Sequence, residues 1–358
     1  MTVTYHSGRR LQGLDADRTA TALPSGSVGG WVELGRTTLG SAGDTIDVTS
    51  LADKRYLMVL GCGIGSGNVA LISRFNSDTG NNYNNRYSSN GGADATSGAN
   101  DRLFTNGSGS SPQEFSVFYV ANKSDKEKLL VGHNVNNATA GAGTAPQRRE
   151  YANKWANTSS VISSLNVFNS DTGDFASGSE VVVLGYDPAD THTTNFWQEL
   201  LSETVGSDVS THTFSSFAAK KYLWIQLYYK FSGVSLPEWA RPIFQFNGDT
   251  GNNYSERGQV NGGSETTNTS SAQLIAANWD NSNTFTNVFI INNASNEKLG
   301  IQHWVNEEST GAGTAPHRRE IAFKWANTSS QITSITLKDA GGYASIDADT
   351  TIKVWGAD

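Results

Sequence analysis

The chain of 358 residues contains few of the residue types that mark disulfide-bonded, redox-active or membrane-inserted proteins. It has one cysteine, Cys62, two methionines and seven prolines. A single cysteine cannot form a disulfide within the chain, and no apolar run approaches the roughly 20 residues of a membrane-spanning helix. The first residues also lack the basic start and apolar run of a secretory signal. We therefore expect no internal disulfide and no membrane insertion.

Charged residues are scarce as well. Asp, Glu, Lys and Arg make up 17% of the chain, against about 25% in an average soluble protein. The net charge of −8 argues against nucleic acid or an anionic membrane as the main partner. Hydrophobic residues amount to 37%, and the 37 glycines bring the apolar share into the range of roughly 45–50% that is typical of globular proteins. The composition predicts a packed core under a surface rich in Ser, Thr, Asn and Gly.

The sequence does contain an internal repeat. Residues 75–83 (FNSDTGNNY) return as residues 246–254 (FNGDTGNNY), and residues 141–160 return as residues 311–330 with three differences. A period near 170 residues is far longer than the roughly 20–50 residues of solenoid repeats. Each copy is therefore expected to be a complete domain. We predict an N-terminal arm at 1–29, a first domain at 30–190 and a second domain at 191–358.

Apolar residues recur with the period of two that is typical of β-strands. Residues 334–337 (SITL) alternate between polar and apolar, which predicts a half-buried strand, whereas residues 222–229 (YLWIQLYY) are apolar on both faces and predict a central strand. Clusters of Gly, Asn, Ser and Asp separate such runs. The predicted fold is all-β, with two tandem β-sandwich domains of jelly-roll-like type. The polar segments 76–112 and 247–282 are predicted to be long irregular loops, where sites often lie.

Two arginines are candidate ligand-binding residues. The strand predicted at 148–155 (RREYANKW) places Arg148 on a charged face, and Arg318 holds the same position in the second copy. A platform of arginine and tryptophan for a sugar or a carboxylate is one interpretation. The alternative, which the sequence favours, is a charge ladder on the outer face of a sheet, with Trp155 and Trp325 in the core.

Asp78 and Asp249 are weak candidates for calcium ligands, because each follows the start of a repeated Asp/Asn/Gly loop. Calcium takes six to eight oxygen ligands, several of them usually carboxylates, and each loop holds a single Asp. A turn in which the Asp side chain caps backbone N–H groups is the better interpretation. Arg86 and Arg257, eight residues further on, are expected to pair with these aspartates. We predict neither a bound metal nor a cofactor.

The sequence offers little for catalysis. Its six histidines show no metal-ligating spacing, and no Gly-x-Ser-x-Gly elbow is present. Cys62 lies in an apolar run flanked by glycines and is expected to be a small core residue. We therefore predict that the protein is not an enzyme.

Two tryptophans are more suggestive of binding. Trp239 and Trp279 are surrounded by turn-forming polar residues, and exposed tryptophan on a β-sandwich is typical of surfaces that bind carbohydrate or protein. The alternative, equally supported, is that each side chain folds back over the edge of its own domain.

Several motifs together resemble those of virion proteins from tailed bacteriophages, notably marine ones. They are residues 5–13 (YHSGRRLQG), the FNxDTGNNY loops, the RRE…KWANTS strands and residues 177–185 (SGSEVVVLG). The resemblance implies jelly-roll modules that decorate a capsid or form a fibre or tail appendage. It implies a place in the virion, assembled in the host cytoplasm, with other virion proteins or further copies of the chain as partners.

The leading hypothesis is thus a structural and interaction component of a phage particle. The N-terminal arm, with Arg9 and Arg10, is expected to attach the protein to a partner, since a polar segment that cannot fold alone can order on another surface. The alternative is a receptor- or glycan-binding adhesin that contacts a host-surface glycan. Residues 191–358 expressed alone are expected to unfold cooperatively.

Overall fold

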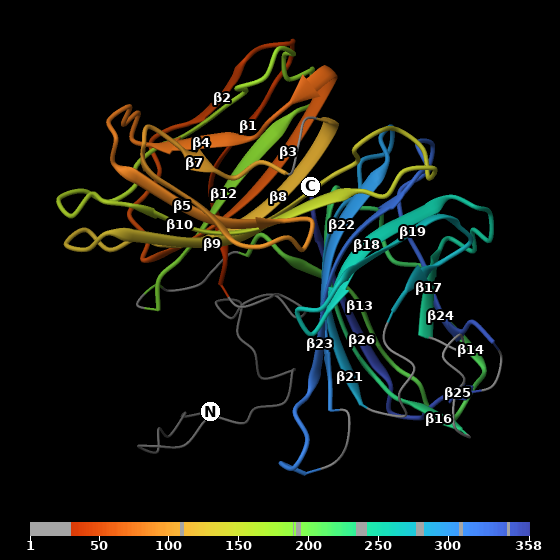
Figure 1. Cartoon of the computed structure of the whole chain (residues 1–358). Coiled ribbons are helices and arrows are strands. Elements are labelled where there is room, and N and C mark those ends of the chain that lie inside the picture. The colour runs from red at the N-terminus through yellow and green to blue at the C-terminus, as the bar shows by residue number, and fades with distance from the viewer. Residues whose placement is uncertain are drawn as a thin grey trace, which may run out of the picture.

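The computed structural model describes residues 30–107, 111–188, 190, 195–233, 242–276, 283–307, 311–341 and 344–358. These residues form antiparallel β-sheets joined by turns and contain no helix, hence none that could span a membrane. Figure 1 shows two sandwiches side by side, the first coloured red to yellow-green and the second green to blue. The all-β fold with tandem sandwiches that the sequence predicts is confirmed.

The first sandwich packs an eight-stranded sheet against a four-stranded sheet. In spatial order the large sheet contains β1 (Val32–Thr38), β12 (Glu180–Tyr186), β3 (Tyr56–Val69), β8 (Ser111–Ala121), β9 (Lys128–Asn136), β10 (Gln147–Trp155), β5 (Tyr83–Ser89) and β6 (Ala95–Asn100). The small sheet contains β2 (Thr45–Val48), β11 (Leu165–Phe168), β4 (Ile72–Phe75) and β7 (Leu103–Phe104). The chain changes sheet repeatedly between β1 and β12, as it does in jelly rolls.

The second sandwich repeats this strand order. Its large sheet contains β13 (Gln198–Thr204), β26 (Thr351–Ala357), β15 (Tyr222–Tyr229), β21 (Thr284–Ile291), β22 (Lys298–Asn306), β23 (His317–Trp325), β18 (Tyr254–Val260) and β19 (Glu265–Ser271). Its small sheet contains β14 (Thr211–Phe214), β24 (Ile335–Asp339), β17 (Pro242–Phe246) and β20 (Leu274–Ile275). One further pair, β16 (Phe231–Gly233) with β25 (Ala344–Ile346), corresponds in the first sandwich to a single bridge between Gly65 and Phe175.

Each sandwich has its own apolar core between its two sheets. Trp155 and Trp325 lie in these cores, each almost fully buried, as the sequence predicts. Trp155 stacks on Tyr83 at 6.3 Å between ring centroids, and Trp325 stacks on Tyr254 at the same distance. Such pairs add roughly 0.5–1.5 kcal/mol to the free energy gained from burying the rings. The repeated sequence thus builds two equivalent cores.

Two segments predicted to be irregular loops contain strands instead. Residues 76–112 hold β5, β6 and β7, and residues 247–282 hold β18, β19 and β20. The outermost of these, β6 and β19, are rich in Ser, Thr and Asn and lie at the edge of the large sheets. The prediction failed there because an edge strand with two largely uncovered faces carries no period-two apolar pattern.

A third apolar cluster lies between the sandwiches, on the outer faces of the two large sheets. The first sandwich contributes alternate residues of β3, namely Met58, Leu60 and Cys62, together with residues of β8, β9 and β12. The second contributes residues of β15, β21 and β22, and Figure 1 shows β8 and β9 approaching β22 at this contact. The central strands are therefore apolar on both faces because one face packs inside the sandwich and the other packs on the neighbouring sandwich.

Candidate functional site

The repeated aspartates close tight turns. The Asp78 carboxylate accepts hydrogen bonds from Gly80 N at 2.8 Å, Asn82 Nδ2 at 2.9 Å and Trp155 Nε1 at 2.7 Å. Asp249 accepts the same set at the same distances, from Gly251, Asn253 and Trp325. Burial alone would raise the pKa of each carboxyl group, but these hydrogen bonds outweigh it and lower both pKa values. The turn interpretation is confirmed, and the carboxylate oxygens are engaged by donors of their own sandwich.

The arginines near these turns have other partners. Arg86 pairs with Asp94 at 3.3 Å, and Arg257 pairs with Glu265 at 2.8 Å. The predicted pairing of Arg86 and Arg257 with the turn aspartates is therefore wrong. Both arginines project from strands of the large sheets toward the neighbouring edge strands β6 and β19, which the sequence analysis took to be loops.

Arg148 lies in the contact between the sandwiches. Its guanidinium donates from Nε to Glu265 at 2.8 Å, from Nη1 to Glu320 at 3.3 Å and from Nη2 to Gln259 at 3.3 Å. Its side chain is 5% exposed, whereas the side chain of Arg318, its counterpart, is 57% exposed and pairs with the nearby Glu320. The two candidate arginines thus occupy equivalent strand positions and very different environments.

Four candidate residues lie outside the described residues. They are Arg9 and Arg10 of the predicted arm and the two loop tryptophans, Trp239 and Trp279. Their predicted roles stay predictions.

The contact between the sandwiches also includes a polar network. The Glu180 carboxylate accepts a hydrogen bond from the Tyr222 hydroxyl at 2.8 Å and pairs with Lys221 Nζ at 3.0 Å. Lys324 Nζ donates to the carbonyl oxygens of Asn137 at 2.9 Å and Thr139 at 2.6 Å. Buried charges of this kind are stable only when paired and hydrogen-bonded. The relative placement of the two sandwiches is therefore specified by polar as well as apolar contacts.

Two histidines meet at the same contact. The rings of His133 and His303 lie 4.4 Å apart between centroids. Burial lowers the pKa of His133 well below its usual value, and the charges of His303 and Arg148 act in the same direction. Burial also lowers the pKa of His303, although Glu320 opposes the shift. Both rings are therefore neutral near pH 7. Within the described ranges no group of three or more His, Cys, Asp or Glu side chains is placed to hold a metal ion.

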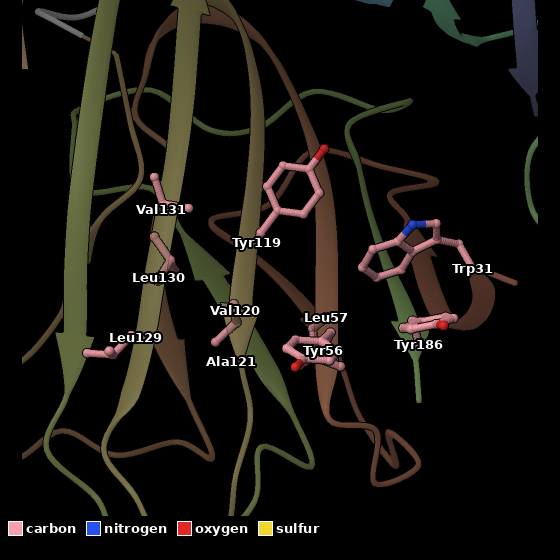
Figure 2. Close-up of a pocket in the computed structure, with 10 residues that line it drawn as sticks. All are labelled: Trp31, Tyr56, Leu57, Tyr119, Val120, Ala121, Leu129, Leu130, Val131 and Tyr186. Carbon is pink, nitrogen blue, oxygen red and sulfur yellow. The ribbon is translucent and has the colours of Figure 1, made fainter. Parts of the chain in front are cut away.

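An uncovered apolar surface lies on the outer face of the first large sheet. We call it the first open face, and it consists of Trp31, Tyr56, Tyr119, Leu129, Val131 and Tyr186. Figure 2 shows these side chains around a groove that also reaches Leu57, Val120 and Ala121. The volume of the groove is about 440 Å³. Its lining is almost entirely aromatic and aliphatic.

The aromatic rings of the first open face support one another. Trp31 lies 6.3 Å from Tyr119 and 5.9 Å from Tyr186, and Tyr56 stacks on Tyr186 at 6.4 Å, each measured between ring centroids. Rigid, mutually packed aromatic side chains present a large apolar area at a low cost in conformational entropy. The face is thus preformed for binding another apolar surface.

Sequence analysis did not identify this surface. The available signal was the apolar character of both faces of the central strands, which predicted only that these strands are central in their sheets. Of the outward residues of β9, Leu129 and Val131 are exposed, whereas His133 and Val135 are covered by the second sandwich. The sequence alone does not tell which part of such a strand is covered.

Comparisons with known proteins assign no family. No protein family model matches the chain, and no curated protein matches it. Among solved structures, the chain is similar to domains LG4-5 of the mouse laminin alpha1 chain, with a TM-score of 0.19 and 10% sequence identity over 98% of this chain and 93% of that one. A TM-score this low does not establish a shared fold. The β-sandwich assignment follows from the strands themselves.

Proposed function

We propose that the protein is a structural component of a phage particle, a capsid decoration or fibre-like protein, and that it acts by binding other proteins. The observation that supports the binding mode is the first open face, where Tyr56, Tyr119, Leu129 and Val131 are exposed on a rigid sheet. Contiguous exposed apolar surface of this kind typically marks a protein–protein contact. Aromatic residues are also the usual centres of binding energy in such contacts.

The particle assignment rests on the resemblance of the repeated motifs to tailed-phage virion proteins. The fold is compatible with it, because two all-β sandwiches with engaged turns and buried polar pairs form a rigid module. In this proposal residues 1–29, with Arg9 and Arg10, attach the protein to the particle, and the first open face makes a second contact.

A glycan is the alternative ligand, since aromatic rings such as Trp31 and Tyr119 also stack on sugars. A sugar carries hydroxyl groups, however, and burying them without hydrogen-bonding partners costs free energy. The groove offers mostly carbon to its occupant. A protein partner is therefore the better match to this surface.

The proposal is tested on phage particles from the source of the gene. Antibodies raised against the protein should label the particles in immunogold electron microscopy, and cryo-electron microscopy should show two-lobed density at the labelled position. Particles of that phage without label or density would overturn the virion assignment. A glycan array distinguishes the alternative: micromolar or tighter binding to one class of sugar, abolished by Trp31→Ala, would favour an adhesin.

A further inference from the structure

The internal contact joins different parts of the two sandwiches. On the outer face of each large sheet, end A is where β9 or β22 begins, and end B is where that strand finishes. The buried cluster between the sandwiches contains end B of the first, with Cys62, Phe115 and Val135, and end A of the second. The end A residues are Trp197, Tyr222, Phe289, Leu299 and Ile301. The equivalent histidines His133 and His303 meet near the middle of this contact. Away from them, the buried residues come from opposite ends of the two sheets, so the contact is heterologous.

The ends that remain open are the counterparts of the ends that are buried. Leu129, at end A of the first sandwich, is 59% exposed, whereas its counterpart Leu299 is fully buried. Phe285, at end B of the second sandwich, is 42% exposed, and its counterpart Phe115 is 1% exposed. Among the described residues all large apolar side chains that are exposed belong to these two ends: Tyr56, Tyr119, Leu129 and Val131 at the first, and Tyr228, Phe285 and Val305 at the second.

A repeated loop is likewise docked in one sandwich and exposed in the other. Residues 141–146 and 311–316 share the sequence GAGTAP and the same turn, with φ of 84° at Gly141 and 89° at Gly311. The first copy docks on the second sandwich, where the Ala142 carbonyl accepts from Ser270 N at 2.7 Å and the Pro146 carbonyl accepts from Arg257 Nε at 2.7 Å. Residues 311–316 are exposed. The second sandwich therefore presents a preformed docking loop at its open end.

The first sandwich has an open receiving site for such a loop. A groove of about 530 Å³ is lined by Arg86, Leu129 and Lys154, among others, which are the counterparts of Arg257, Leu299 and Lys324. The charges also match. Asp94, paired with Arg86, stands where Glu265 receives Arg148, so it is placed to receive Arg318 of another copy.

We propose that copies of this chain associate head to tail. End B of the second sandwich in one copy docks on end A of the first sandwich in the next. This repeats the contact seen within the chain, except at His133 and His303, which already contact each other. A heterologous contact closes into a ring or continues as a filament. The inference rests on the proposed function in one respect, since both assign the first open face to binding a protein.

The contact between copies should be weaker than the contact within one chain. Leu60, Val117 and Val182 of the buried end B are replaced by Gln226, Asn287 and Lys353 in the open one. These polar residues have partners within their own sheet, such as Glu199 for Lys353 at 2.7 Å. We therefore expect reversible assembly that depends on concentration.

The test uses two variants of the full chain that each block one end. Leu129→Lys/Val131→Lys charges end A of the first sandwich, and Phe285→Lys/Val305→Lys charges end B of the second. All four side chains are exposed, so thermal melts by circular dichroism should match the parent. The control Thr45→Lys/Thr211→Lys adds the same charge on the small sheets, where both threonines are exposed.

Sedimentation velocity of the parent chain should show a mass that rises beyond the dimer between micromolar and millimolar concentration, and the control should behave alike. Each blocked variant alone should raise the dissociation constant at least about tenfold. An equimolar mixture of the two should form a dimer and stop there, because each partner retains one working end and the two ends differ.

A parent chain that stays monomeric, or variants that associate like the parent, would overturn the inference. A variant blocked at end A that alone still forms dimers, and that forms no heterodimer with the variant blocked at end B, would indicate a symmetric contact and also overturn it. A monomeric chain that nevertheless labels phage particles would leave the proposed function standing. Head-to-tail assembly of a chain that is absent from phage particles would support this inference and overturn the proposed function.

Discussion

The two sandwiches share a strand order and long stretches of sequence, yet their equivalent residues differ in environment. Arg148 is buried against Glu150, Glu265, Glu320 and Gln259, whereas Arg318 is exposed and pairs with Glu320. Lys324 is buried on two carbonyl groups, whereas Lys154 pairs with Glu127 near the surface at 3.0 Å. The difference comes from which neighbour each sandwich contacts. A local sequence fixes what a surface can bind, and the arrangement of domains decides whether that surface is occupied.

Separating the sandwiches should produce the largest effect. A fragment of residues 191–358 keeps its own core but uncovers Trp197, Tyr222, Leu299 and Ile301. We expect it to bind the dye 8-anilinonaphthalene-1-sulfonate, to self-associate, and to melt below the full chain, because exposed apolar area costs about 25 cal/mol per Å². Adding residues 1–190 in trans should reverse all three. A monomeric fragment that melts like the parent would show that the contact contributes little to stability.

The arginine pair gives a sharper comparison with a smaller effect. Arg148→Met removes a buried cation, but Glu265 keeps Arg257 and Glu320 keeps Arg318. We therefore expect a loss of about 2 kcal/mol in the free energy of unfolding, mainly from the lost hydrogen bonds to charged groups. Arg318→Met, at the equivalent exposed position, should change it by less than about 0.5 kcal/mol. Urea denaturation followed by tryptophan fluorescence measures both. Equal losses would contradict the difference in environment.

The histidine pair should produce the smallest effect, visible as a dependence on pH. Folding lowers the pKa of His133 and His303, so the unfolded chain binds more protons below its own histidine pKa of about 6.5. The stability that the neutral rings contribute is complete above that pH and declines as the pH falls through the folded-state pKa values. Arg148 and Arg318 add positive charge nearby, and Glu320 offsets part of it.

The measurement compares the melting temperature at pH 7.5 and pH 5.5 in the parent and in His133→Gln/His303→Gln. The decrease in melting temperature on acidification should be smaller in the variant than in the parent, because glutamine does not titrate. An identical drop would assign the effect to carboxyl groups elsewhere. In the parent background, Glu320→Gln alone should enlarge the drop in melting temperature, since the negative charge of Glu320 favours the protonated ring of His303.

Much of the fold could be predicted from local patterns. The repeat predicted two equivalent units, and the alternation in segments such as 334–337 predicted strands with one buried face. The turns at Asp78 and Asp249 were also predictable, because a side chain that caps backbone two residues away depends only on neighbouring residues. The alternation and the turns each depend on residues that are close together in the sequence. The edge strands β6 and β19 were missed because a sheet edge leaves no apolar signature.

The sequence by itself determined that this protein is all-β, that it is duplicated, and that its central strands are apolar on both faces. It did so because these properties depend on residue type and spacing along one segment. Only the tertiary structure decided that Leu299 is buried while Leu129, at the equivalent position on the outer face of its sheet, is exposed. It also decided that Arg148 rather than Arg318 is buried. Burial at those positions depends on how one sandwich is placed on the other, through pairs such as Glu180 and Tyr222 that lie 42 residues apart in the chain.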